Sequence, residues 1–321
     1  MQKNGATCVL SSAGISGGEK IKIIVFGAGA LGSFVGGMLS KKHDVLLVCR
    51  KSHAEEIKRN GLRISGETDY IAHPDAATSL KKSDAELVIL TVKAYDTRQA
   101  VKKIAGKCNC PILSLQNGIG NEETISEIAG SERTIGGITT HGVRYMSPGN
   151  IIHTGKGETI IGEMDNSLTR RVKKYADAMT ECGIQTKVSR DIRKDIWHKA
   201  IVNASINPLT AVLRCKNGYL LENKHAKQLM EKLCMEATIA AKSNGIDVDE
   251  TEIMKRAEEV AYLTRENYSS MLQSIIRGKK TEIDYINGEI VKAGMKKGVE
   301  MPANSFLIEL IKAMENAAVA P

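Results

Sequence analysis

A short apolar strand, a glycine-rich turn and a helix of small residues follow one another where the regular pattern of the chain begins. The strand is Ile21 to Phe26, the helical periodicity runs to about Leu39, and between them lies Gly27-Ala28-Gly29-Ala30-Leu31-Gly32. In such a unit the first glycine permits a tight turn, the second lets the backbone approach a pyrophosphate, and the third lets the helix pack on the strand. The free N–H groups at the helix N-terminus then face the anion. The unit predicts dinucleotide binding, and the alternative is a glycine turn with no ligand.

Further apolar runs of strand length alternate with helical segments. They are Asp44–Cys49, Ala85–Val92, Pro111–Leu115 and a run within Ser131–Thr140. Buried runs that alternate with helices indicate a parallel sheet covered on both faces, and each run is far shorter than the roughly 20 residues that cross a bilayer. The segment Ile151–Glu163 predicts a β-hairpin, because apolar and polar residues alternate on either side of its central glycines.

After about Arg190 the pattern becomes helical. Periodic segments cover Asp191–Leu213, Lys224–Asn244, Asp249–Ile276, Thr281–Lys297 and a last helix opened by Pro302. Pro208 is expected to end or kink the first of these, and Thr281 with Asp284 is expected to cap the fourth. We therefore expect an α/β fold: a disordered extension over residues 1–20, a Rossmann-type parallel-sheet domain over 21–190, and an all-helical domain over 191–321 for substrate binding and dimerisation.

The charge and the cysteines restrict the possible partners. The 321 residues include 45 Lys+Arg and 37 Asp+Glu, for a net charge of +8, but the basic residues are dispersed among acids. No RNA-binding aromatic signature or zinc-finger spacing is present, so neither nucleic acid nor a membrane is expected as a partner. The seven cysteines are odd in number and irregularly spaced, which favours reduced thiols in a cytoplasmic protein and no metal site.

The residues after the second strand indicate which dinucleotide binds. Folds that prefer NAD usually have an acidic residue there to bind the ribose hydroxyls, whereas this chain has Arg50-Lys51. A guanidinium can grip a phosphate with two hydrogen bonds, so Arg50 favours NADPH/NADP+. Lys93, which follows the strand Ala85–Val92, would add a second positive charge at the same edge of the sheet. The alternative is that Arg50 is a solvated surface charge.

Lys199, Asn203 and Asn207 are spaced by four residues and so form one stripe of a helix. Their apolar neighbours need burial, so the stripe faces either a cleft or, in the simpler reading, solvent. A lysine that is partly desolvated in a cleft can act as a general acid toward a carbonyl oxygen. His198 points about 100° away from Lys199 around this helix, and we expect both His198 and His141 to be structural.

The sequence resembles the ketopantoate reductase (2-dehydropantoate 2-reductase) family over essentially all of residues 21–316. The motifs that carry the resemblance are Gly27–Gly32, Thr91–Ala94, Gln116–Gly118, Lys199–Asn203, Ile206–Thr210, Asn217-Gly218, Ser269–Gln273 and Thr281–Gly288. The chain departs from the family at Ser274, where an acidic residue is common after the glutamine.

The resemblance implies an NADPH-dependent reduction of ketopantoate to D-pantoate, on the route to pantothenate and coenzyme A. Lys199 would be the general acid, and Glu282 would lie near it. The substrate's carboxylate and hydroxyl groups would be bound by Asn203, Asn207, Asn217 and Ser270. The cofactor would be bound by the Gly27–Gly32 turn, by Arg50 and Lys93 at the 2′-phosphate, and by Asn117, Val143 and Glu282 at the nicotinamide half.

Two alternatives stay open from the sequence. The substrate could be another 2-keto acid, because family motifs determine the chemistry better than the side-chain specificity. The chain could also be a non-catalytic NADP(H)-sensing protein, although a sensor has no need of a proton donor. A homodimer through the helical domain is expected by family likeness alone.

Overall fold

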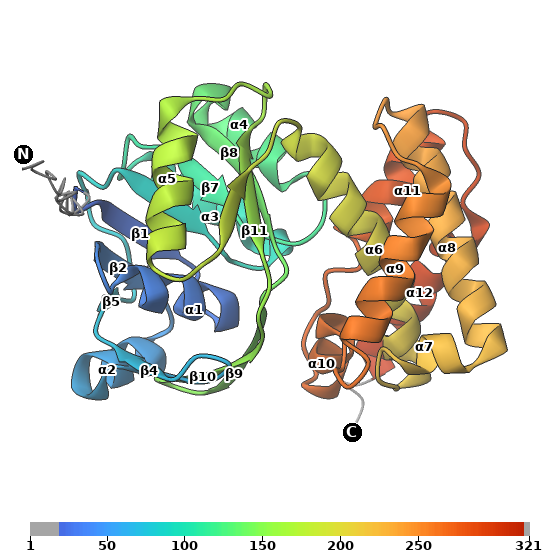
Figure 1. The fold of residues 1–321 in the computed structure, drawn as a ribbon, viewed down its shortest axis with the longest axis horizontal. Helices are drawn as coiled ribbons and strands as arrows, with labels where there is room; N and C mark the ends of the chain where they lie inside the picture. The colour runs from blue at the N-terminus through green and yellow to red at the C-terminus, as the bar shows by residue number, and fades with distance from the viewer. Residues whose placement is uncertain (1–18, 318–321) are drawn as a thin grey trace, which may run out of the picture.

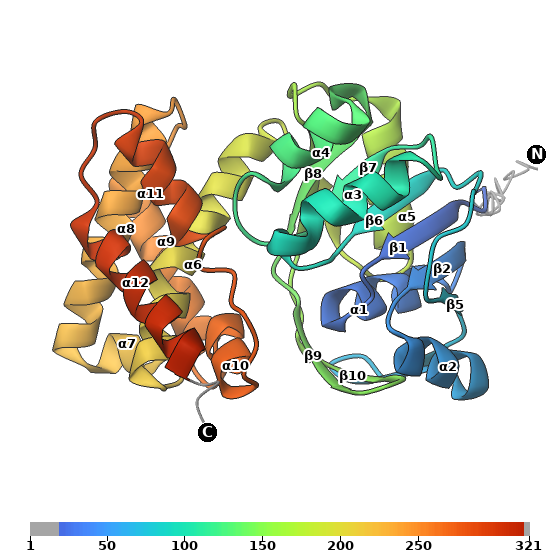
Figure 2. The same ribbon diagram turned by 180° about the vertical axis from the view of Figure 1, so that it is seen from behind.

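The computed structural model describes residues 19–317, and the extension expected over residues 1–20 lies almost wholly outside this range. Figures 1 and 2 show a half built on a β-sheet beside an entirely helical half. This arrangement confirms the expected fold class. Within residues 19–317 no helix is both long and apolar enough to cross a membrane.

The large sheet has eight strands in the order β12-β11-β8-β7-β6-β1-β2-β5, parallel except where β11 pairs with β8. The strands are β1 Lys22–Phe26, β2 Asp44–Val48, β5 Asp75–Ala77, β6 Leu87–Leu90, β7 Ile112–Ser114, β8 Thr134–Thr139, β11 Thr159–Glu163 and β12 Thr186–Val188. The helices of this half are α1 Ala30–Leu39, α2 Lys51–Asn60, α3 Thr97–Ala105, α4 Asn121–Ala129 and α5 Arg170–Glu181, with 3-10 turns η1 Ala94–Asp96 and η2 Ser131–Arg133.

Helices cover both faces of this sheet, as the continuous apolar runs predict. Along β1, Ile23 and Val25 pack into the core beneath α1 and α5, whereas Ile24 packs into the core beneath α3 and α4. The two views show α1 and α5 on one face and α3 and α4 on the other (Figures 1 and 2). A strand buried on both faces needs apolar residues at successive positions, and β1 has them from Ile23 to Phe26, after the exposed Lys22.

A second sheet corrects the predicted hairpin. Its order is β4-β3-β10-β9, with β3 Leu62–Gly66, β4 Tyr70–Ala72, β9 Gly142–Ser147 and β10 Asn150–Gly155. The prediction that Ile151–Glu163 forms a hairpin is wrong, because β10 pairs with β9 and β3 while β11 joins the large sheet. The tight turn lies instead before β10, where Gly149 has a φ of +71°. Alternation identified both strands but could not say which partner each one takes.

The helical half contains α6 Ile192–Leu213, α7 Tyr219–Glu222, α8 Lys224–Ser243, α9 Glu250–Leu263, α10 Ser270–Ile276, α11 Asn287–Met295 and α12 Pro302–Ala317. Side-chain caps open several of these helices, because a polar oxygen at the N-cap accepts an otherwise unpaired N–H. The caps are Asp191 for α6, Asn223 for α8, Asp249 for α9 and Ser269 for α10. The predicted cap at Thr281 is wrong, since Ile283–Ile286 form turns and the helix begins at Asn287.

Helix α6 continues through Pro208, contrary to the expected break. Proline has no N–H to donate to the carbonyl four residues earlier, which here belongs to Ala204. The Asn287 side-chain amide donates to that carbonyl oxygen instead, at 3.1 Å. Since the orphaned acceptor is satisfied by another helix, α6 stays continuous for 22 residues. It packs first against β8 and β11 and then enters the helical core (Figure 2).

Candidate active site

The glycine turn between β1 and α1 has the backbone that its sequence predicts. Gly27 has a φ of +97°, and a Cβ there would lie 2.6 Å from the Val92 nitrogen, so only glycine fits. A Cβ on Gly32 would collide with the Thr91 hydroxyl, which fixes the close packing of α1 on the sheet. Both positions therefore require glycine for reasons internal to the fold.

Gly29 is different, because the protein itself leaves room for a side chain. A Cβ there would meet only the Gly27 carbonyl oxygen, at 3.9 Å. The neighbouring N–H groups of Ala30, Leu31 and Gly32 lie in the first turn of α1 and have no backbone acceptor among residues 19–317. Open space beside unpaired N–H groups at a helix N-terminus fits a pyrophosphate. The turn can thus hold a dinucleotide, and the observation is independent of the motif.

Arg50 lies at the end of β2 and caps the start of α2 with its backbone. Its side chain is exposed and takes part in no ion pair within the described range. Lys51 next to it lies 3.9 Å from Glu55, an ordinary pair on a helix surface. The guanidinium of Arg50 is consequently free to meet a phosphate at the carboxyl end of the parallel strands.

Lys93 follows β6 and contacts the helical half of the molecule. Its ammonium lies 2.5 Å from a carboxylate oxygen of Glu282, and the other oxygen of Glu282 accepts the Ala94 N–H at 3.2 Å. Glu282 is buried, whereas the Lys93 side chain is 43% exposed. The carboxylate expected beside Lys199 thus makes its direct ion pair with Lys93.

Lys199 projects from α6 toward the loop between β7 and α4. Its Nζ donates to Asn117 Oδ1 at 2.9 Å, and Asn117 is held in turn because Asn121 Nδ2 donates to its backbone oxygen at 3.0 Å. Burial lowers the pKa of Lys199 to about 8, against the opposing charges of Glu282 and Glu122. A partly buried ammonium with a pKa near neutrality is suited to donate a proton.

The amide stripe continues along α6 from Lys199. Asn203 is partly buried and Asn207 is buried. The backbone oxygen of Asn207 accepts from Ser269 Oγ at 3.3 Å, and this contact ties the start of α10 to α6. Ser270, the first residue of α10, is exposed next to this contact. The simple alternative of a solvent-facing stripe does not hold, because none of the three side chains is exposed.

Two other expected site residues make no side-chain hydrogen bond to Lys199, Asn203 or Asn207 within the described residues. Asn217 is buried and donates from Nδ2 to Thr264 Oγ1 at 2.8 Å, while its Oδ1 is buried with no partner within the described chain. Val143 lies in β9, partly buried against the core beneath α1. Of the two histidines, His198 contacts the Asp247 carbonyl and His141 pairs with His153 at 3.1 Å, so neither contacts Lys199.

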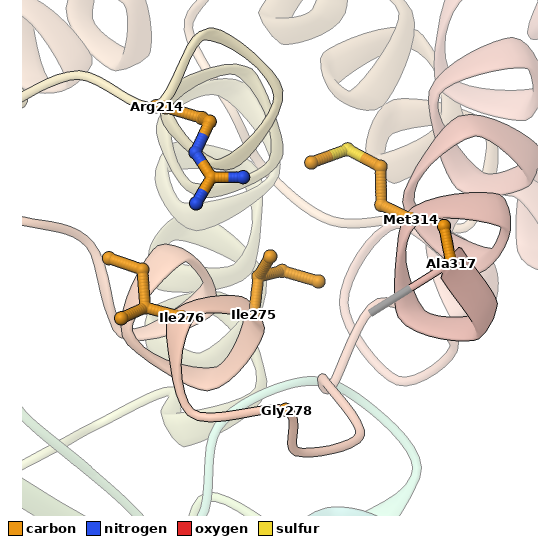
Figure 3. Close-up of a pocket in the computed structure, with 6 residues that line it drawn as sticks. All are labelled: Arg214, Ile275, Ile276, Gly278, Met314 and Ala317. Carbon is orange, nitrogen blue, oxygen red and sulfur yellow. The ribbon is translucent and has the colours of Figure 1, made fainter. Parts of the chain in front are cut away.

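A pocket of about 410 Å³ lies away from these residues. Figure 3 shows its lining at the far end of α6, from Arg214, Ile275, Ile276, Gly278, Met314 and Ala317. No predicted site residue lines it, so it is not the candidate site. Among the described residues, no cluster of His, Cys, Asp and Glu could hold a metal ion, and the six cysteines of this range are free.

Sequence reasoning missed Glu122. It follows Asn121 in the first turn of α4, where an acidic residue is common at the surface, but its side chain is only 3% exposed. Burial raises the pKa of Glu122 to about 7. The sequence held no sign of this burial, because the adjacent Glu123 is exposed and looks identical in the pattern.

Comparison with known proteins is consistent across the chain. The family model described as "Ketopantoate reductase PanE/ApbA" matches residues 23–166, and its C-terminal counterpart matches residues 191–315. A 2-dehydropantoate 2-reductase of Pyrococcus abyssi is 41% identical, covering 92% of this chain and 98% of that protein. The corresponding enzyme of Archaeoglobus fulgidus is 36% identical over the same shares.

Solved structures agree on the fold. A PanE/ApbA family ketopantoate reductase from Ralstonia eutropha superposes with a TM-score of 0.85 at 28% identity, covering 94% of this chain and all of the other. D-mandelate dehydrogenase bound to NADH and anilino(oxo)acetate gives a TM-score of 0.87 at 30% identity, covering 93% of this chain and all of the other. With both family models matched in order along most of its length, this chain belongs to the ketopantoate reductase family.

Proposed function

We propose that this chain reduces 2-dehydropantoate (ketopantoate) to D-pantoate with NADPH, a step toward pantothenate and coenzyme A. The observation that carries the proposal is the partly buried ammonium of Lys199. This residue lies on α6 and donates to Asn117, in the loop between β7 and α4. The names of the curated relatives support the choice of substrate.

The chemistry divides between the cofactor and the protein. NADPH, when bound, supplies the hydride that reaches the carbonyl carbon. Lys199 donates its proton to the carbonyl oxygen, and its positive charge stabilises the negative charge that develops there. Asn203, Asn207, Asn217 and Ser270 bind the carboxylate and hydroxyl groups of the substrate without adding charge.

The cofactor assignment rests on charge at the end of β2. A nicotinamide cofactor agrees with the family and with the NADH-bound relatives of similar fold. We assign NADPH because Arg50 is exposed and unpaired within the described chain, and because no carboxylate stands at its position to repel a phosphate. Lys93 can reach the same phosphate once its contact with Glu282 is shared or released. Asn117, Val143 and Glu282 remain the assigned contacts of the nicotinamide half.

The test follows NADPH absorbance with ketopantoate and a panel of 2-keto acids that includes aryl-substituted ones. Turnover is expected to be best with ketopantoate, and Lys199→Ala should lower kcat by at least about 10²-fold, the usual size for a lost general acid. Lys194→Ala is the matched control, since this lysine lies on the same helix and pairs with Asp247 at the surface.

Each other outcome identifies an alternative. A better rate on an aryl 2-keto acid would replace ketopantoate, and the similarity to D-mandelate dehydrogenase is the observation behind including that class. Tight NADPH binding with no turnover on any acid would make the chain a sensor. An unchanged kcat in Lys199→Ala would remove the proton-donor role.

Two broader assignments complete the proposal. The free cysteines of the described range suit a reducing compartment such as the cytoplasm. Homodimerisation through the helical half is supported by apolar side chains that this half exposes, among them Leu229, Met235, Ile239 and Phe306. Sedimentation at several concentrations measures this directly.

A further inference from the structure

The Glu122 carboxyl is buried without a direct cationic partner. Its side chain is 3% exposed, yet no Lys, Arg or His among residues 19–317 approaches it closely enough for a salt bridge. The Ser114 hydroxyl lies beside it and is buried too. A buried carboxyl normally has a compensating partner, because removing a charge from water is costly. The burial of Glu122 therefore calls for an explanation in terms of its surroundings.

The geometry directs Glu122 toward the first turns of α6. A small cavity is lined by Ile119, Gly120 and Glu122 on one side and by Ile196 and Trp197 on the other. The last two residues lie one turn before Lys199 or less, and both views show α4 beside this part of α6 (Figures 1 and 2). The carboxyl thus lines the same small cavity as two residues of α6 that shortly precede Lys199.

The loop that bears Glu122 also holds the Lys199 ammonium. Asn117 accepts from Lys199 and is bonded through its backbone to Asn121, the residue before Glu122. Asn121 is fixed by the Thr97 hydroxyl, which donates to Asn121 Oδ1 at 2.9 Å. These hydrogen bonds connect Lys199 through Asn117 and Asn121 to the start of α4. The fold therefore holds Glu122 and Lys199 in a fixed relation to each other.

The charges around Glu122 favour an interaction with Lys199. Burial and the like charge of Glu123 raise the pKa of Glu122, whereas hydrogen bonds from Ser114 and from its own backbone, and the positive charge of Lys199, lower it. In return Glu122 raises the pKa of Lys199, in the same sense as Glu282. Arg193, at the rim of the cavity, is exposed and solvated. Of these two cations, the partly buried Lys199 is the less exposed to water.

We propose that Glu122 is a positioning carboxylate that keeps the proton on Lys199, acting from the sheet domain while Glu282 acts from the helical domain. The inference rests on the proposed role of Lys199. In each turnover the Nζ–H bond breaks as the substrate O–H bond forms, and the neutral amine then regains a proton from water. An ionised Glu122 stabilises the reprotonated ammonium, so it extends the pH range over which Lys199 is ready to donate.

The experiment compares pH profiles of kcat/KM for ketopantoate in the wild type, Glu122→Gln and Glu123→Gln. Without the Glu122 charge the Lys199 ammonium loses its proton at lower pH. The ratio of kcat/KM at pH 9 to that at pH 7 should then fall about threefold or more in Glu122→Gln, the equivalent of about half a pH unit. Glu123→Gln removes an exposed carboxylate from the same helical turn and should leave this ratio close to the wild-type value.

A second readout does not depend on turnover. The rate at which trace acetic anhydride acetylates Lys199, followed by peptide mass spectrometry across pH, reports the fraction of neutral amine. Its midpoint should move to lower pH in Glu122→Gln, together with the kinetic limb. If the chain turned over no keto acid, this midpoint would still test Glu122, so the two proposals can fail separately.

An unmoved midpoint in a folded Glu122→Gln protein would overturn the inference, as would an equal shift in Glu123→Gln. If Glu122→Gln does not fold, Glu122→Asp is compared instead. Its charge is retained but lies farther from Lys199, so a smaller shift in the same direction is expected, and no shift would count against the role.

Discussion

Two lysines on helix α6 show how strongly the surroundings of a residue affect its pKa. Lys194 lies near the surface, and its hydrogen bond to Asp247 raises its pKa. Lys199 lies little more than one turn later. Burial lowers its pKa to about 8, even though its amine donates to Asn117. Desolvation disfavours a charged amine, whereas a neighbouring carboxylate favours it. The same residue type on the same helix is thus a surface ion in one place and the proposed proton donor in the other.

Cofactor preference is a second property of single residues, and Arg50 tests it. In Arg50→Asp a carboxylate replaces the exposed guanidinium, repelling a 2′-phosphate and accepting hydrogen bonds from ribose hydroxyls. The ratio of kcat/KM for NADPH to that for NADH is expected to fall by at least about tenfold, given the usual strength of charge-assisted hydrogen bonds. Steady-state kinetics with both cofactors measures it.

Lys58→Asp provides the control, because Lys58 is exposed in the last turn of the same helix, α2. It changes the net charge equally but lies about two helical turns along α2 from Arg50. A cofactor ratio unaltered in Arg50→Asp, or altered equally in both variants, would show that Arg50 does not contact the phosphate.

At the level of elements, the glycine turn separates a requirement of the fold from a requirement of the ligand. In Gly32→Ala the new methyl group would collide with the Thr91 hydroxyl and come within 3.0 Å of the Gly27 carbonyl, so the protein should be destabilised by about 1–3 kcal/mol. In Gly29→Ala the methyl meets only one atom, at 3.9 Å, so the free energy of unfolding should change by less than about 1 kcal/mol.

The two variants should rank in the opposite order for cofactor binding. Gly29→Ala places a methyl where the pyrophosphate approaches the backbone, and the Kd for NADPH is expected to rise at least about tenfold. Urea denaturation and fluorescence titration together check the pair. Unchanged NADPH affinity in a stable Gly29→Ala protein would contradict binding at this turn.

The elements also show where sequence patterns stop being informative. The parallel strands and the helices were predictable from local sequence patterns. Strands buried on two faces appear as continuous apolar runs, and helices show a 3.6-residue periodicity of apolar residues. The predicted hairpin at Ile151–Glu163 failed because alternation does not name a strand's partner. The continuity of α6 past Pro208 depends on Asn287, about 80 residues away, which no local pattern contains. Glu122 escaped notice for the same reason, since its surroundings include residues distant in the sequence, such as Trp197 across the small cavity.

At the scale of the whole molecule, buried histidines make stability depend on pH. Burial lowers the pKa values of His43, His53, His141 and His153, and that of His141 to about 4. Between pH 6.5 and about 4 these histidines bind protons in the unfolded chain but not in the folded protein. Stability therefore decreases as the pH falls through this range. For His141, partly exposed, the loss between pH 7.5 and 5 should be about 1–2 kcal/mol.

Urea denaturation at the two pH values measures this loss. His141→Gln should reduce the difference in unfolding free energy between them, because the side chain no longer titrates. His73→Gln, at an exposed position, should leave the difference unchanged. A difference as large in His141→Gln as in the wild type would assign the acid sensitivity to other groups.

The uninterrupted helix α6 has a consequence for how the two halves can move. Its first turns belong to the sheet domain through Ile192 and Ile196, and its last turns belong to the helical core through Leu209 and Ala211. Lys199 lies between these two anchorages. If the helical half swings relative to the sheet half, the axis of rotation must pass close to the helix that joins them, and atoms near an axis travel least. Lys199, the proposed proton donor, would therefore be displaced little by such a rotation.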